Sequence, residues 1–333
     1  MKRREFLKFG TAGVASSMLG SLGLLTWVPR AHAITINKTY YINDGFVSQV
    51  DEQDVYFRGF SNSTGALNVP AEPIIAQEGD TLNITIVNTL GTTHSFVIDG
   101  VIDSGSIAGG TTKTLSFTVN NAGSYLFYDK LNAPYNRLLG LHGGFAVMPS
   151  GSSNELYDGS ATFVQQYFWI TNDIDPVWHD AIRVGNTPTT TFTPRYFTIN
   201  GRNMRVPGHP EYTNTDRDSG YATDTRLVGS IGDRTLIRIQ NVGLGRHSVH
   251  FHANHVEWLA VNGTPRPQVW KKDTLNLPNN KGSLDVIYPF ESPPDAWPPV
   301  STGHFPMHFH DEMTQTAGGG FYQFGLATTI EFK

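Results

Sequence analysis

The sequence contains no cysteine among its 333 residues. This absence excludes disulfide bonds and every metal site that needs a thiolate ligand. Positive charge is also scarce, because 24 lysine and arginine residues stand against 29 aspartate and glutamate residues, a formal net charge of −5. An acidic chain of this kind is not expected to bind nucleic acid.

Common catalytic motifs are missing as well. No Gly-x-Ser-x-Gly motif of a serine hydrolase is present, and Gly318-Gly319-Gly320 lacks the Lys-Ser or Lys-Thr that completes a phosphate-binding loop. Residues 35–149 show no long apolar period of 3.6 residues, which argues against helices in that part. Function must therefore be sought in other residue patterns.

One long apolar stretch is present, at the N-terminus. It runs from about Phe9 to Val28, follows the basic segment Met1–Lys8 with its Arg3-Arg4 pair, and ends at Ala31-His32-Ala33. This pattern indicates a twin-arginine export signal with cleavage after Ala33, and an uncleaved membrane anchor is the alternative. We therefore set residues 1–33 aside from the fold, expect no membrane span after their removal, and expect a periplasmic or otherwise exported protein.

The remainder reads as short β-branched and aromatic runs separated by glycine, asparagine and proline. Thr81–Val87 alternates with a period of two residues, which is typical of a half-buried strand. A polar break at 149–154 separates two halves in which the pattern starts over. These observations predict an all-β protein of two β-sandwich domains, at 34–150 and 161–333, joined by a linker at 151–160.

Histidine is concentrated in two short segments. Seven of the 12 histidines lie in 247–255 and 304–310. On an extended strand His250 and His252 project to one side, as do His308 and His310, and neutral imidazole is a good ligand for copper, zinc, iron or nickel. Two such strands side by side would form a metal site, whereas either pair alone could also be chance on a solvated strand.

Several motifs resemble those of two-domain multicopper oxidases and copper nitrite reductases, over essentially the whole chain after residue 33. The resemblance rests on His247-x-x-His250-x-His252, His308-Phe309-His310, His94, Gly123–Lys130 and Gly140–Pro149. It implies two Greek-key cupredoxin domains. In two-domain relatives the copper cluster lies between subunits, so the resemblance also implies a homotrimer with an inter-subunit metal site.

The resemblance implies a reduced set of copper ligands. His94 and His250 match the type-2 pair, and His252, His308 and His310 match three type-3 ligands. The other three ligand positions hold Phe96, Tyr128 and Lys130, so one or two copper ions are expected, and zinc suits the same ligands. His142 and His247 are secondary candidates, and Asp129, Asp311 and Glu312 are carboxylates close to the matched positions.

The blue type-1 copper site is expected to be lost. Phe309 stands at the cysteine position, Thr314 at that of the second histidine and Gly319 at that of the axial ligand. Without thiolate this copper loses its defining soft ligand. The leading hypothesis is an exported copper-binding protein, an oxidoreductase if it is active, or a copper tolerance or storage protein with an unidentified small-molecule or protein redox partner. A metal-free structural or interaction protein on the same scaffold is the alternative.

Overall fold

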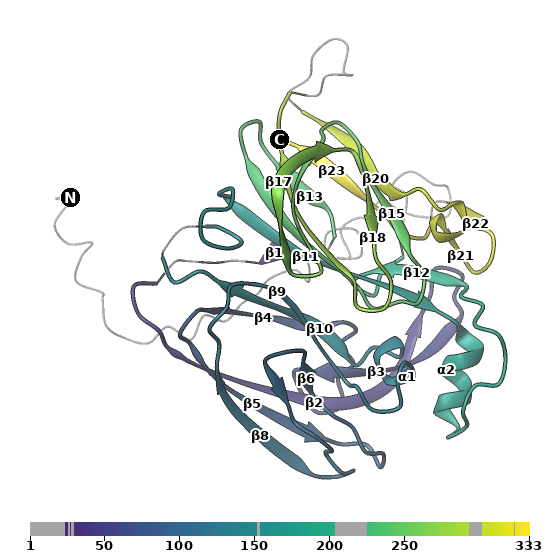
Figure 1. Ribbon diagram of the computed structural model, residues 1–333. Coiled ribbons are helices and arrows are strands. Elements are labelled where there is room, and N and C mark those ends of the chain that lie inside the picture. The colour runs from purple at the N-terminus through teal and green to yellow at the C-terminus, as the bar shows by residue number, and fades with distance from the viewer. Residues whose placement is uncertain are drawn as a thin grey trace, which may run out of the picture.

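The computed structural model describes residues 24–25, 27, 30–151, 154–203, 225–292, 302–322 and 324–333. In these residues the regular structure is almost entirely β-strand, which confirms the predicted all-β class. Figure 1 shows the strands of the N-terminal half below those of the C-terminal half. In the described residues every helix is too short or too polar to cross a lipid bilayer.

The N-terminal half forms two sheets packed face to face. One has the order β3-β2-β5-β8 and the other β4-β10-β9-β6-β7. The elements are β2 (Thr35–Ser48), β3 (Asp54–Ser61), β4 (Ala71–Gln77), β5 (Thr81–Asn88), β6 (Val97–Ile98), β7 (Ile102–Asp103), β8 (Thr112–Thr118), β9 (Gly123–Tyr128), α1 (Tyr135–Leu138) and β10 (His142–Met148). Leu82, Ile84 and Ile86 of β5 alternate inward into the core with Phe60 and Phe127, as the period-two pattern predicts.

The C-terminal half also builds two sheets. The larger has the order β1-β11-β14-β19-β16-β17 with β12 paired to β11, and the smaller has the order β13-β23-β20-β15-β18. The elements of the larger sheet are β1 (Leu24–Leu25), β11 (Gln165–Ile174), β12 (Tyr196–Ile199), β14 (Arg234–Asn241), β16 (Val256–Val261), β17 (Thr264–Lys272) and β19 (Ser283–Pro289). Those of the smaller sheet are β13 (Leu227–Gly229), β15 (His247–Phe251), β18 (Thr274–Leu277), β20 (Gly303–Phe309) and β23 (Ala327–Phe332).

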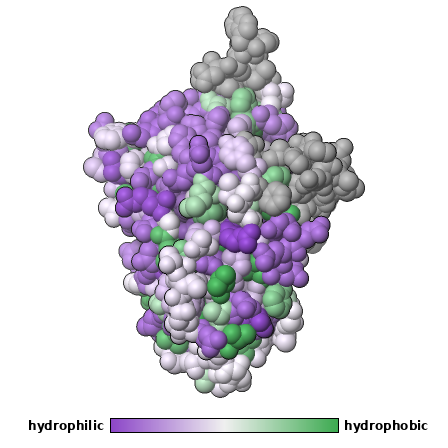
Figure 2. All heavy atoms as spheres, turned by 90° about the vertical axis from the view of Figure 1, so that its right-hand side faces the viewer, coloured by the Kyte–Doolittle hydropathy of each residue, from purple (hydrophilic) through white to green (hydrophobic). Residues whose placement is uncertain are grey.

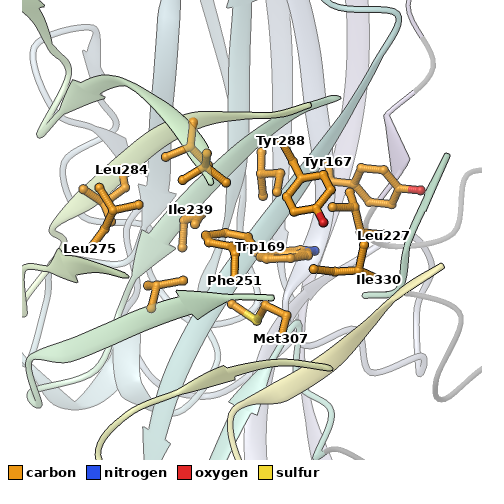
Figure 3. Close-up of a cluster of buried hydrophobic side chains, with 14 of the residues drawn as sticks. Tyr167, Trp169, Leu227, Ile239, Phe251, Leu275, Leu284, Tyr288, Met307 and Ile330 are labelled. Carbon is orange, nitrogen blue, oxygen red and sulfur yellow. The ribbon is translucent and has the colours of Figure 1, made fainter. Parts of the chain in front are cut away.

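The core of the C-terminal half lies between these two sheets. Trp169 of β11 stacks on Phe251 of β15, with ring centroids 6.2 Å apart and planes 13° apart. Figure 3 shows Phe251 and Met307 directed into this cluster beside Trp169, with Tyr288 nearby. Because neighbouring side chains on a strand point to opposite faces, burying Phe251 and Met307 turns the histidines beside them outward.

Some elements were not predicted. Residues 248–260 read as one strand in the sequence, but β15 and β16 are separated by a turn at which Ala253 has a φ of 67°. Helix α2 (Pro176–Arg183) was missed, although Asp175 caps it by accepting from the Val177 and Trp178 amides. The short elements η1 (Glu312–Gln315), β21 (Thr316–Ala317) and β22 (Phe321–Tyr322) follow β20.

A buried polar network joins the two halves. Arg238 of β14 is fully buried and donates from Nη1 to Ser124 Oγ of β9 at 2.8 Å and from Nε to Gln166 Oε1 at 2.9 Å. The Ser124 hydroxyl in turn donates to the Asp285 carboxylate of β19. Polar groups out of water are costly unless they are paired, so this network favours one way of docking the halves. The predicted domain boundaries themselves remain a prediction.

The segment set aside as a signal is described only in part, because residues 1–23 lie outside the described ranges. Leu24 and Leu25 pair with Tyr167 and Gln166 at the edge of β11. Arg30 forms a salt bridge with the buried carboxylate of Asp80. Part of the segment therefore contacts the fold from which we excluded it.

On the face shown in Figure 2, hydrophobic residues are scattered among hydrophilic ones.

Candidate metal centre

Strands β15 and β20 are antiparallel neighbours, as the two histidine segments predict. His250 lies opposite His308, and Phe251 lies opposite Met307. His250 of β15 and His308 of β20, with His252 and His310 just after these strands, emerge on one face while the apolar neighbours are buried. The register therefore gathers His250, His252, His308 and His310 at one place on the sheet.

The nitrogen atoms of this group are close enough to share an ion. One ring nitrogen from each of His250, His308 and His310 lies within 4.8 Å of the others. Nε2 of His252 is 3.1 Å from Nε2 of His308. The rings of His250 and His310 have centroids 4.4 Å apart. His310 is exposed and the other three are half-buried, so solvent reaches the group.

His308 and His252 have complementary hydrogen-bonding roles. Nδ1 of His308 lies 3.2 Å from the Phe309 carbonyl, which can only accept, so this nitrogen donates. In the neutral ring Nε2 of His308 then carries the lone pair and accepts from His252. A metal ion would replace that shared proton. Tyr288 donates to the His252 carbonyl at 2.9 Å, which holds the backbone of this ligand in place.

Electrostatics keep two of these rings neutral. Burial, followed by the neighbouring histidines, lowers the pKa of His250 to about 4. Burial and the charges of His308 and His310 also lower the pKa of His252. Because a metal binds the neutral imidazole, these shifts leave both rings ready to ligate at neutral pH.

A threonine, Thr274, and a carboxylate, Asp273, lie beside His250. Thr274 Oγ1 is 2.9 Å from His250 Nδ1, and Asp273 Oδ2 is 3.9 Å from the same nitrogen. Partial burial raises the pKa of Asp273, but hydrogen bonds from its own backbone and from Thr274, together with nearby histidine charge, lower it overall. Neither residue was predicted from the sequence, because the segment 273–277 carries no recognisable motif.

His94 lies in the N-terminal half and both of its ring nitrogens have partners. Its Nδ1 donates to Asp129 Oδ2 at 2.7 Å, and Thr92 Oγ1 lies 2.8 Å from Nε2. Asp129 also accepts from the amide and hydroxyl of Ser95 and from Asn136. The His94 and Asp129 side chains are fully buried. Among the described residues, His94 joins no group of three metal-ligating side chains.

The secondary candidates are also held within the fold. His142 is buried and its Nδ1 donates to the Arg137 carbonyl at 2.8 Å, and burial lowers its pKa to about 4. His247 Nε2 lies 3.0 Å from Asp173 Oδ1, while its Nδ1 is buried without a partner. The ring of His247 meets Phe309 edge-on at 5.6 Å, and Phe309 is fully buried. Neither histidine joins the group on β15 and β20.

The three substituted ligand positions have other roles. Phe96 is fully buried in the aromatic core and stacks on Phe127. Tyr128 donates to Asp99 at 2.8 Å, and Lys130 forms a salt bridge with Asp103. Of the carboxylates noted in the sequence, Asp129 contacts His94, while Asp311 and Glu312 are exposed.

Comparison with known proteins supports the resemblance. Residues 50–152 match the sequence model of the multicopper oxidase family. The blue copper oxidase from Nitrosomonas europaea has a TM-score of 0.70 and 20% identity, covering 89% of this chain and 86% of that chain. The copper nitrite reductase from Nitrosomonas europaea has a TM-score of 0.64 and 18% identity, covering 90% and 94%. Multicopper oxidase mgLAC has a TM-score of 0.70 and 20% identity, covering 90% and 87%. No curated protein sequence matches the chain.

Residues 50–152 thus match the multicopper oxidase family model, and the chain shares the fold of solved multicopper oxidases and copper nitrite reductases. This confirms the predicted resemblance and the cupredoxin-like sandwiches. At identities of 18–20%, these comparisons establish the fold alone. The candidate metal ligands are therefore judged from the geometry of this chain.

Proposed function

We propose that this protein binds copper through His250, His252, His308 and His310. The observation that carries the proposal is the approach of ring nitrogens from His250, His308 and His310 to within 4.8 Å of one another on a solvent-accessible face. With His252 this makes up to four imidazole ligands. Four ligands are enough for one ion, and a second ion would need further ligands.

The donor set fits copper. The ligands are all imidazoles and the chain has no cysteine, a combination that suits copper(II) and also zinc. The fold shared with copper oxidases and a copper nitrite reductase favours copper. When bound, copper would supply one-electron redox chemistry. The residues of this chain supply neutral ligands, hold the two strands in register and keep the ion accessible to solvent.

A blue copper site is not expected. Phe309 is fully buried in the core, and its ring lies against His247, where a cysteine would be required. The absence of thiolate removes the ligand that gives such sites their character. The protein therefore lacks the cysteine-to-histidine electron route of its relatives, which favours a slower single-copper oxidoreductase, or copper storage and tolerance, over four-electron reduction of dioxygen.

The oligomeric state bears on His94. A homotrimer would bring the N-terminal half of one subunit to the histidines of the next. For His94 to ligate in such an assembly, the Thr92 hydroxyl must release Nε2, while Asp129 keeps Nδ1 protonated and oriented. Export through the twin-arginine route is part of the same proposal, because that route carries proteins that are already folded.

Metal analysis and electron paramagnetic resonance of the purified, copper-loaded protein test the proposal. We expect about one copper per chain by the ligand-count argument, with a type-2 signal and no blue absorbance. His250→Ala with His308→Ala should abolish stoichiometric copper while the fold is retained. His304→Ala, on the exposed face of the same strand β20, is the matched control and should bind normally.

Stoichiometric copper in the double variant would show that these residues are not the ligands. A wild-type protein that takes up neither copper nor zinc would favour the metal-free alternative. That alternative is a structural or interaction protein, and the fully buried Phe309 and the fully partnered His94 are the observations in its favour.

A further inference from the structure

A histidine ligates metal only through a ring nitrogen that carries a lone pair, so the position of its single proton matters. At His308 the Phe309 carbonyl settles this question, because a carbonyl can only accept a hydrogen bond. At His250 the partner is the hydroxyl of Thr274, which can donate or accept. The threonine alone therefore leaves two tautomers of His250 open.

Asp273 removes this ambiguity. Asp273 Oδ2 lies 3.9 Å from His250 Nδ1, and the negative charge of the carboxylate at that distance favours a proton on this nitrogen. With Nδ1 protonated, the Thr274 hydroxyl oxygen accepts from it. At 3.9 Å the carboxylate makes no direct hydrogen bond, so its effect on the ring is electrostatic.

The strand pairing holds this arrangement in place. Thr274 is the direct cross-strand partner of His250 in the antiparallel pair of β18 and β15. The amide of Phe251 donates to the Asp273 carbonyl at 2.8 Å, which ties the residue next to His250 to the residue before Thr274. The pairing of β18 with β15 therefore sets the positions of Thr274 and Asp273 beside His250.

We propose that Asp273 and Thr274 are positioning residues that fix His250 with its proton on Nδ1 and its lone pair on Nε2, directed at the metal site. The expected consequence, tighter copper binding, rests on the proposed function. Its geometric claim concerns the metal-free protein and can be decided separately. Neither residue touches the ion.

The decisive variants are Thr274→Val, which keeps the shape and removes the hydroxyl, and Thr274→Ser, which keeps the hydroxyl. Nitrogen-15 NMR of the metal-free protein reports the tautomer of His250, and competition with a chromogenic chelator reports copper affinity. In Thr274→Val we expect His250 to populate the other tautomer and copper affinity to fall about tenfold or more, as is usual for lost outer-shell partners. Thr274→Ser should restore both.

Two further variants complete the design. Asp273→Asn should give an intermediate result, because it removes the negative charge and keeps the Thr274 contact. The Asp273 side chain is half exposed, so this variant does not disturb the core. Thr92→Val is the matched control, since it removes the comparable threonine contact to His94 and should cause no loss of copper affinity.

The outcomes separate the two claims. Unchanged tautomer and affinity in Thr274→Val would overturn the positioning role, and so would failure of Thr274→Ser to restore them. A wild-type protein that binds no copper would reject the proposed function. In that case the nitrogen-15 spectra of the wild type, Thr274→Val and Asp273→Asn would still decide whether the two residues set the tautomer.

Discussion

Each half of the molecule places a histidine beside a threonine hydroxyl and a carboxylate, with opposite results. In the N-terminal half, Asp129 binds one ring nitrogen of His94 directly and Thr92 binds the other. In the C-terminal half, Thr274 contacts Nδ1 of His250, and the ring lies among the other histidines. The first ring is fully buried and the second is partly exposed.

The two histidines match the same type-2 pair of the resembled family, but their surroundings differ. What decides is whether a nitrogen lone pair remains after the local hydrogen bonds are made. His94 has two partners of its own and serves to join the loop at Thr92 to Asp129. His250 keeps its second ring nitrogen free, because its hydrogen-bond partner, Thr274, contacts Nδ1.

The largest expected effect comes from removing the two carboxylates in turn. Asp129→Ala leaves buried donors of His94, Ser95 and Asn136 without an acceptor, and we expect it to cost about 3–5 kcal/mol of unfolding free energy. Asp273→Ala removes a half-exposed group and should cost less than about 0.5 kcal/mol. Chemical denaturation of both variants measures this, and equal costs would contradict the proposed difference in burial.

Low pH should lower the stability of the protein through other histidines that are buried in the fold. Burial lowers the pKa of His179 to about 4, and its Nδ1 donates to the Tyr56 carbonyl. Between pH 6.5 and 4 the unfolded chain takes up a proton that the folded chain refuses, so stability falls as pH falls, by about 2–3 kcal/mol for this residue.

His179→Asn tests this effect, since it keeps a donor for the Tyr56 carbonyl and cannot titrate. Its unfolding free energy, measured at pH 7 and pH 4.5, should fall less than that of the wild type. His255→Asn, at an exposed position, is the control. A pH dependence identical to the wild type in His179→Asn would show that the buried ring is not responsible.

A smaller effect is expected at Thr92. Thr92→Val leaves Nε2 of the buried His94 without a partner and should cost about 1–2 kcal/mol. If a homotrimer forms and His94 ligates there, the same variant should also tighten copper binding, because the nitrogen no longer has to be released. Chemical denaturation measures the stability, and copper titration at protein concentrations at which the trimer assembles measures the affinity. A variant as stable as the wild type would show that the Thr92 contact does not stabilise the buried His94.

The smallest effect is expected at Lys130, which occupies a ligand position of the resembled family. Its salt bridge with Asp103 lies at the surface, where ion pairs contribute little. Lys130→Ala should therefore leave both the denaturation midpoint and the copper stoichiometry unchanged within error. A loss of copper would mean that this position still belongs to the metal site.

The sequence allowed the strands and the histidine pairs to be predicted because both depend on a period of two residues. The alternation that buries Phe251 and Met307 also sets His250 and His308 on one face, and the structure shows these strands paired. The partners of the histidines could not be predicted in the same way. Thr274 reaches His250 only through the pairing of β18 with β15, and that register depends on the whole sheet.

Helix α2 and the break between β15 and β16 were missed for a local reason. The capping residue Asp175 and the turn at Ala253 each occupy a single position, which carries less signal than a repeated apolar pattern. The ligand positions of His94 and His250 looked equivalent in the sequence because both are histidines. Only the surrounding hydrogen bonds distinguish them.

The buried contacts of Arg238 make the two halves depend on each other. This guanidinium, in the C-terminal half, reaches Ser124 across the junction, and Ser124 donates to Asp285. A fragment cut between the halves would present a charged pair and a wide apolar surface to water, and each piece would need the other supplied in trans. We therefore expect the two halves to unfold together, and recombining them with those of relatives would require matching these three residues as a set.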